Sequence, residues 1–247
     1  MDLVFLGENS YGMRSFLFIG FILLVGYSYT QTGTITDVRD GKVYETVVIG
    51  SQTWMAEDLQ VIKYNNGDPI FQAKSEEDWS NFGKTQKGCF YELNNGIILY
   101  NGYALKDPRG ILPTGYRLPS YSDFAKLIEY LGGGESMIGT STLSLATYPI
   151  YIDEWVGDQE TGGLETVEVQ TNGNSGFNAV MGGFIDETGY GSMSLSAEPA
   201  NCSYWWTSSF ENGQRIGVDI GYCSQYTGGG KANYPVAFGL AIRAIKN

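Results

Sequence analysis

The chain contains no histidine in its 247 residues. This absence excludes Ser-His-Asp and Cys-His catalytic arrangements and every metal site that needs an imidazole ligand. Basic residues are also few: 15 Lys and Arg stand against 27 Asp and Glu, which gives a net charge of −12. That sign is wrong for binding nucleic acid or an anionic membrane surface. We therefore expect no nucleic-acid partner, no cofactor and no catalytic residue.

Glycine and aromatic residues are abundant instead. The chain has 34 Gly, 18 Tyr, 12 Phe and 5 Trp, whereas charged residues make up only 17%. This composition favours strands and structured loops over helices. Hydrophobic residues at 43% are enough to fill a core, so the chain is expected to fold.

The only long apolar run, residues 16–25, lies near the N-terminus. It is shorter than the roughly 20 residues that a membrane-spanning helix needs, and Arg14 precedes it. A positive flank, a short apolar stretch and small residues after it are typical of a secretory signal peptide. We predict a signal peptide over residues 1–30, with translation starting at Met13 and cleavage before Gln31, or alternatively before Tyr29. Residues 31–247 then form one exported domain that is secreted, periplasmic or at the cell surface, with no membrane insertion after cleavage.

Several local patterns predict secondary structure. Residues 34–49 are rich in β-branched side chains around Asp40-Gly41, which predicts a hairpin with a type I′ turn. A short helix is expected over residues 55–59. Ser75 can cap a second helix at the amide of Asp78.

The clearest helix follows Ser120, which stands three residues before Asp123 in a capping pattern. Apolar residues recur at helical spacing over residues 124–131, and the glycines at 132–134 end the helix. Alternating apolar residues over 236–245 predict a final, half-buried strand.

Asn212-Gly213 between two apolar runs is the strongest short hairpin signal in the chain. One face of this hairpin is assigned to the core, with Trp205, Ile216, Val218 and Ile220. The opposite face carries Tyr204, Trp206, Phe210, Arg215 and Asp219.

The same hairpin predicts a disulfide. If the turn has two residues, counting outward places Cys202 directly opposite Cys223 at a non-hydrogen-bonded pair, where Cα atoms lie about 4.5 Å apart. A disulfide tolerates that spacing, and an exported protein meets an oxidising environment. Cys89 is then a free, buried thiol.

Six segments together resemble the Fibrobacter succinogenes major paralogous domain (FISUMP) family, over about residues 40–246. In chain order they are IGSQTWMAEDL, GCFYELNNG, PTGYRLPSYSDFAKLIEYLGG, SGFNAVMGGFID, YWWTSSFENG and FGLAIRAIK. The block at residues 115–119 also resembles formylglycine-generating sulfatase modifiers. Both resemblances imply an α+β, C-type-lectin-like fold: a twisted antiparallel sheet with two helices and long structured loops. The family consists of exported bacterial proteins whose biochemical role is largely unassigned.

The chain departs from the family pattern at three positions. Leu112 and Ala244 stand where the family commonly has cysteines, which suggests that these two residues face each other in a packed core. Arg117 replaces a histidine of the family, so any role of that imidazole is absent.

The resemblance also directs the functional interpretation. In lectin-like folds the loops over the sheet carry the ligand site, so we assign ligand binding to Tyr204, Trp206, Phe210, Arg215 and Asp219. On that assignment Trp206→Ala reduces binding more than stability. The acidic residues Asp153, Glu154, Asp158, Glu160 and Glu198 are interpreted as a solvated face rather than a calcium site.

The sequence thus favours an exported, non-catalytic binding or adhesion module for a polysaccharide or a surface protein. Two alternatives stay open: a cysteine-dependent oxidase related to formylglycine-generating enzyme, and a structural component of a cell-surface assembly.

Overall fold

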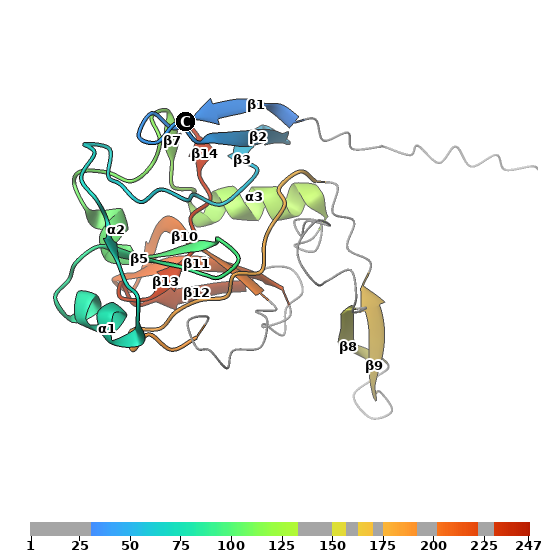
Figure 1. Ribbon diagram of the computed structural model, residues 1–247. Coiled ribbons are helices and arrows are strands. Elements are labelled where there is room, and N and C mark those ends of the chain that lie inside the picture. The colour runs from blue at the N-terminus through green and yellow to red at the C-terminus, as the bar shows by residue number, and fades with distance from the viewer. Residues whose placement is uncertain (1–30, 133–149, 157–162, 170–174, 192–201, 222–229) are drawn as a thin grey trace, which may run out of the picture.

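The computed structural model describes residues 31–132, 150–156, 163–169, 175–191, 202–221 and 230–247 (Figure 1). The helices are α1 (Glu76–Lys84), α2 (Gly102–Lys106) and α3 (Tyr121–Leu131). The strands up to α3 are β1 (Gln31–Thr36), β2 (Val43–Ile49), β3 (Gln52–Met55), β4 (Phe71–Gln72), β5 (Cys89–Glu92), β6 (Ile98–Asn101) and β7 (Tyr116–Arg117). Those that follow are β8 (Ile150–Val156), β9 (Gly163–Val169), β10 (Cys202–Glu211), β11 (Gln214–Gly221), β12 (Gly230–Tyr234), β13 (Gly239–Leu240) and β14 (Ile245–Lys246).

The strands form three sheets and a separate hairpin. The sheet orders are β1-β2-β3-β14-β7, β13-β6-β5-β4 and β10-β11-β12, and β8 pairs with β9. Among the named strands all pairs are antiparallel except β4 with β5. Helix α3 lies between the five-stranded sheet and β10-β11-β12, while the β8-β9 hairpin projects from the body (Figure 1). The protein is therefore α+β and mainly antiparallel, as the family resemblance implies.

The two predicted helix starts are confirmed, because both depend only on local chemistry. The hydroxyl of Ser75 accepts from the amide of Asp78 and begins α1. Ser120 and Asp123 form a complete capping box at the start of α3, and Gly132 ends that helix in the left-handed conformation with φ +76°.

The first hairpin is also confirmed, but its turn differs from the prediction. The closing contact is between Asp37 and Lys42, whose amide and carbonyl are 2.8 Å apart, so the loop has four residues. Gly41 has a positive φ of +77°, whereas Asp40 does not, and a type I′ turn needs both. The Asp37 carboxylate supports this wider loop by accepting a hydrogen bond from the Arg39 side chain.

The predicted helix over residues 55–59 is wrong. Met55 is the last residue of β3, and the residues after it are irregular. Their amides are satisfied by distant partners: Met55 donates to the carbonyl of Ala244 and Leu59 donates to that of Ile242. Contacts with the C-terminal segment, which no local pattern reveals, replace the helical hydrogen bonds here.

The C-terminal strand prediction needs a similar correction. Residues 239–245 are buried on both sides rather than half-buried, and only β13 and β14 within them are strands. The intervening Ala241 bridges to Trp205 of β10, with an amide of Trp206 donating to its carbonyl. This segment therefore runs through the centre of the molecule.

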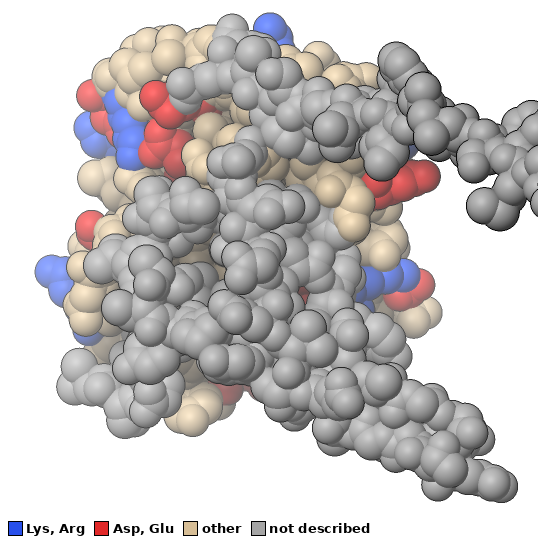
Figure 2. All heavy atoms as spheres, turned by 90° about the vertical axis from the view of Figure 1, so that its right-hand side faces the viewer, with Lys and Arg blue, Asp and Glu red and all other residues tan. Residues whose placement is uncertain are grey.

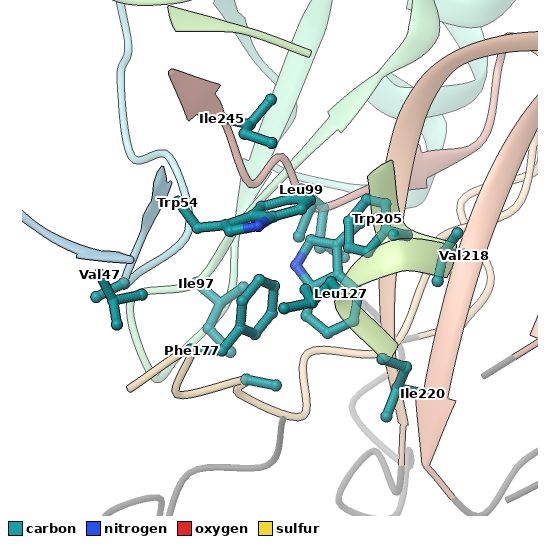
Figure 3. Close-up of a cluster of buried hydrophobic side chains, with 14 of the residues drawn as sticks. Val47, Trp54, Ile97, Leu99, Leu127, Phe177, Trp205, Val218, Ile220 and Ile245 are labelled. Carbon is teal, nitrogen blue, oxygen red and sulfur yellow. The ribbon is translucent and has the colours of Figure 1, made fainter. Parts of the chain in front are cut away.

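Buried side chains form two clusters that lie on opposite sides of β10. The first contains Trp54, Phe124, Phe177 and Trp205, whose rings contact each other at centroid distances of 5.0–6.5 Å. Figure 3 shows Trp54, Phe177 and Trp205 close together in this cluster. The second contains Tyr100, Trp206, Ile242 and Ala244. Leu112 packs against this second cluster, so Leu112 and Ala244 lie in the same core region, while their direct contact stays a prediction.

A buried ion pair lies against Trp205 and Phe177 of the first cluster. Asp58 Oδ1 accepts hydrogen bonds from Arg243 Nε at 2.7 Å and from Trp205 Nε1 at 2.8 Å. The Arg243 guanidinium also lies over the Phe177 ring, 4.4 Å from its centroid, and donates to the Phe177 carbonyl. Arg243 is fully buried, so this network fixes the C-terminal segment against β10 and the loop after β3.

The second hairpin has the predicted turn but a different register. Asn212 and Gly213 both have positive φ, and Glu211 pairs with Gln214. A β-bulge between Trp206 and Phe210 then shifts the pairing by two residues, so that Cys202 lies opposite Gly221. The predicted register is therefore wrong beyond the bulge.

Because Cys202 lies opposite Gly221, the predicted direct pairing of Cys202 with Cys223 across the hairpin no longer supports a disulfide between them. Cys223 lies outside the described residues, so the Cys202–Cys223 pair stays a prediction. Cys89 is a free, fully buried cysteine, as expected. The signal peptide over residues 1–30 also lies outside the described part of the chain.

Candidate functional site

The face predicted to bind ligand is largely covered by the rest of the protein. Trp206 has no exposed surface and donates from Nε1 to the carbonyl of Tyr100 at 2.8 Å. Its ring meets Tyr234 edge-on at 6.3 Å. Trp206 therefore belongs to the core, and the expectation that it projects toward a ligand is wrong.

The neighbouring residues of this face are partly or fully enclosed. Tyr204 is half-buried and packs edge-on against Phe184 and Tyr234 at 5.2 and 6.2 Å. Asp219, opposite Tyr204 in the register, is buried. Burial raises the pKa of Tyr204, and the nearby Asp219 carboxylate adds to the rise. The phenol is therefore a neutral packing group at physiological pH.

Phe210 and Arg215 separate from the other three predicted residues, because they lie on the turn side of the bulge. Phe210 is 52% exposed, and the buried Arg215 guanidinium lies 4.5 Å from its ring centroid. Arg215 donates to the Thr207 carbonyl at 2.7 Å. The structure thus does not bring the five predicted residues together on one open surface.

One sequence signal could have revealed this arrangement. Trp205 and Trp206 are adjacent, so they point to opposite faces of β10, and each requires a buried environment. Trp205 lies in the first cluster and Trp206 in the second. Two consecutive tryptophans therefore indicate a strand that is covered on both sides.

An open pocket lies elsewhere, lined by residues of α2 and by residues that follow α1 and α2. The two helices are on the left in Figure 1. We call it the α1–α2 pocket; its volume is about 310 Å³. It is lined by Tyr64, Phe71, Gln86, Lys87, Gly88, Tyr103, Lys106, Asp107, Pro108 and Arg109. These residues come from four stretches of the chain, and the sequence analysis names none of them as a site.

Gly88 and Tyr64 form the floor of the pocket. A Cβ at Gly88 would lie 2.4 Å from the Tyr64 hydroxyl and 2.8 Å from the Ala104 Cα atom, so only glycine permits this close approach of α2. Burial raises the pKa of Tyr64 to about 12, with a further contribution from the Asp107 carboxylate. The floor is thus uncharged at neutral pH.

Arg109 is clamped at the rim. Its Nε and Nη2 donate to the two oxygens of Asp107 at 2.8 Å each, and Nη1 donates to Asp68 at 3.0 Å. The guanidinium carbon lies 3.9 Å from the Tyr64 ring centroid. The hydrogen bond from Arg109 holds the pKa of Asp107 below its usual value, so this wall is a fixed ion pair.

Asn101 holds two walls of the pocket together. Its Nδ2 donates to the Lys87 carbonyl at 2.9 Å, and its Oδ1 accepts from the amide of Ala104 at 3.1 Å, which caps α2. Asn101 is fully buried. Lys87 and the helix that carries Lys106 are therefore anchored to one side chain.

Two lysines of the pocket have uncompensated charge. Lys87 and Lys106 are exposed, and neither forms an ion pair with a carboxylate in the described part of the chain. The Lys87 ammonium lies 5.3 Å from the ring centroid of Phe71, which is 48% exposed and stacked on Phe82. The lining of the pocket is thus positively charged, although the chain as a whole has a net charge of −12.

The cysteine in the neighbouring strand is not a reactive group. Cys89 is fully buried, and burial raises the pKa of its thiol well above the usual value. Its Sγ accepts from Asn101 Nδ2 at 3.1 Å and its amide donates to Asn101 Oδ1 at 3.0 Å. The residue therefore packs as a small apolar side chain beneath the pocket.

The acidic residues that the sequence analysis interprets as a solvated face fall largely outside the described side chains. Asp158, Glu160 and Glu198 lie outside the described residues, and only the backbone is described for Asp153 and Glu154. Within the described ranges no three Cys, Asp or Glu side chains gather as a metal site. On the face shown in Figure 2, described acidic and basic side chains lie together at the upper left.

None of the described helices is long and apolar enough to cross a bilayer. The described geometry is that of a mainly antiparallel α+β protein with an aromatic and cationic surface pocket.

The chain belongs to the Fibrobacter succinogenes major domain family, because the model of that family matches residues 47–246. This confirms the resemblance carried by the six sequence segments. Comparisons with curated proteins and with solved structures found no match.

Proposed function

We propose that the protein is an exported, non-catalytic binding or adhesion module that recognises a polysaccharide or another surface protein. The α1–α2 pocket is the observation that carries this proposal. It combines exposed ring surface at Phe71 with hydrogen-bonding and charged side chains on a fixed framework, as binding sites for small polar ligands do. A volume near 310 Å³ suits one or two residues of a larger chain-like ligand, at the lower end of the range of about 300–1,000 Å³ for ligand sites.

In this proposal the fold is C-type-lectin-like, as the family resemblance implies. The curled antiparallel sheets and the two longer helices, α1 and α3, support it. The binding surface then differs from the one assigned to the hairpin, because the packing of Trp206 closes that face.

The oxidase alternative receives less support. A cysteine-dependent oxidase needs a thiol that can ionise and meet its substrate. Cys89 is enclosed, and Cys202 is also buried. Without histidine, neighbouring general bases would have to be carboxylates.

A glycan array tests the proposal, with the full chain compared with the Phe71→Ala/Tyr103→Ala variant. We expect the wild type to bind a defined group of oligosaccharides, and the variant to lose that binding while keeping its circular dichroism spectrum. Equal binding by both proteins places the site elsewhere. No binding by the wild type, with sedimentation only as fibres or sheets, supports the structural-component alternative instead.

A further inference from the structure

The charges around the α1–α2 pocket specify its ligand further. The pocket region contains three cations, Lys87, Lys106 and Arg109, and two carboxylates, Asp68 and Asp107. Both carboxylates are engaged by Arg109, and hydrogen bonds hold the pKa of each below its usual value. Arg109 is therefore already paired, which leaves the two lysines for a ligand.

We propose that the α1–α2 pocket binds an anionic sugar, a uronic acid or a sulfated residue of a polysaccharide, through Lys87 and Lys106. This inference rests on the proposed function and adds the chemical class of its ligand. The ammonium groups hold the carboxylate or sulfate, while the ring of Phe71 packs against the apolar face of the sugar.

The surroundings favour an anion over a neutral sugar. The chain has a net charge of −12, whereas Lys87 and Lys106 lie together at one pocket and form no ion pair with a carboxylate in the described part of the chain, so the pocket can attract an anion locally. A lysine ammonium on a flexible stem can reach a ligand group and form a charge-assisted hydrogen bond. The ring of Phe71 lies 5.3 Å from the Lys87 ammonium, so an apolar surface for a sugar ring and a cation for its acidic group stand side by side.

The framework beneath the lysines is rigid enough to position them. Asn101 hydrogen-bonds the backbone of Lys87 and caps the helix that carries Lys106. Gly88 allows both α2 and the Tyr64 hydroxyl to lie directly against the backbone that follows Lys87. Both lysine backbones are therefore fixed before a ligand arrives, which lowers the entropy lost on binding.

The test is calorimetric titration of the full chain with four oligosaccharides: trigalacturonate, its methyl ester, a sulfated galactan tetrasaccharide and cellotriose. We expect one or both anionic sugars to bind and the methyl ester and cellotriose to bind at least tenfold more weakly. Lys87→Gln and Lys106→Gln should each weaken binding about tenfold or more, as loss of a charged hydrogen bond does. Lys126→Gln, an exposed lysine on α3, changes the net charge equally and should leave binding unchanged. Binding of the anionic sugars should also weaken as NaCl is raised.

The outcomes separate this inference from the proposed function. Equal binding of trigalacturonate and its methyl ester, lost in Phe71→Ala, overturns the anionic ligand but keeps a glycan-binding pocket. Equal effects of the three lysine variants overturn the pocket assignment. Absence of binding by all four oligosaccharides overturns the anionic-sugar inference, and the absence of any bound glycan on the array removes the polysaccharide version of the function as well. Preference for the sulfated sugar over trigalacturonate identifies the source of the anionic group.

Discussion

The β10–β11 hairpin and the α1–α2 pocket carry the same kinds of side chain, aromatic rings beside charged groups, and differ in what covers them. On the hairpin, Trp206 is buried beneath β6 and the C-terminal segment, and Asp219 is buried as well. At the pocket, Phe71 is 48% exposed and Lys87 and Lys106 face water. Residue types alone therefore do not distinguish a binding surface from a core.

The charged groups of the two regions differ in the same way. In the core next to the hairpin, Arg243 and Asp58 form an ion pair with each other and have almost no exposed surface. At the pocket, Arg109 is paired at the rim while two lysines keep their charges unpaired. A buried charge needs its partner to be tolerated, whereas an exposed unpaired charge is available to a ligand.

The largest effect is expected from breaking the ion pair next to the hairpin. Arg243→Met leaves the Asp58 carboxylate buried with Trp205 as its remaining partner, so the free energy of unfolding should fall by about 3–5 kcal/mol. Urea unfolding followed by tryptophan fluorescence measures this loss.

A double-mutant cycle provides the control for that measurement. The Asp58→Asn/Arg243→Met variant should lose clearly less stability than the two single variants together, because no unpaired charge is left. Additive losses would show that the pair does not act as a unit. If Arg243→Met does not fold, Arg243→Lys retains the charge and keeps the cycle measurable.

Trp206→Ala should give the next largest loss of stability. The sequence analysis expects this substitution to reduce binding more than stability, and the structure leads us to expect the opposite. The indole is fully buried and its N–H is hydrogen-bonded to Tyr100, so we expect a loss of about 3–4 kcal/mol in the free energy of unfolding. Oligosaccharide affinity of the folded fraction should be unchanged. Lost affinity with a normal urea midpoint would return Trp206 to the ligand site.

The difference between the two regions also explains what the sequence could predict. The starts of α1 and α3 and the Asn212-Gly213 turn were predictable, because each depends on residues within four positions of one another. The face of Trp206 was not, because its cover comes from β6 and from residues 234–242. The bulge after Trp206 had no local signal either, and it moved the partner of Cys202 from residue 223 to Gly221.

The α1–α2 pocket could not be predicted for the same reason. Its lining residues are spread from Tyr64 to Arg109, and only the packing of α2 on Gly88 brings them together. The residue that organises the pocket, Asn101, looks like an ordinary loop residue in the sequence. Arg243 had a weaker signal: a charged residue inside the apolar run before Lys246 indicates a buried partner, but it does not identify Asp58.

An acid titration tests how much the ion pair between Arg117 and Asp123 stabilises the fold. Burial alone would raise the pKa of Asp123, but hydrogen bonds from Arg117 and Ser120 outweigh it and hold the pKa well below the usual 3.8. A lowered folded-state pKa gives stability that is present above pH 3.8 and lost as the pH falls through the folded-state pKa. We expect Asp123→Asn to cost about 1–2 kcal/mol at pH 7 and to flatten the loss of stability below pH 4.

Glu129→Gln is the control for that titration, because it removes one exposed negative charge from the same helix. Its pH profile should be parallel to that of the wild type. A parallel profile for Asp123→Asn as well would mean that the contact with Arg117 contributes nothing to the folded state.

The smallest effect on stability is expected at the pocket, with Phe71→Ala. The ring of Phe71 is about half exposed and contacts Phe82 at 5.2 Å, so its removal should lower the free energy of unfolding by less than about 1 kcal/mol. Both Trp206→Ala and Phe71→Ala remove one aromatic side chain, so the larger loss for Trp206→Ala reflects its full burial, its larger indole and its hydrogen bond to Tyr100. Thermal and urea unfolding of the two variants side by side checks it. If Phe71→Ala lowers the free energy of unfolding as much as Trp206→Ala does, the Phe71 ring supports the fold and is not free to meet a ligand. The contrast between a covered hairpin and an open α1–α2 pocket would then be wrong.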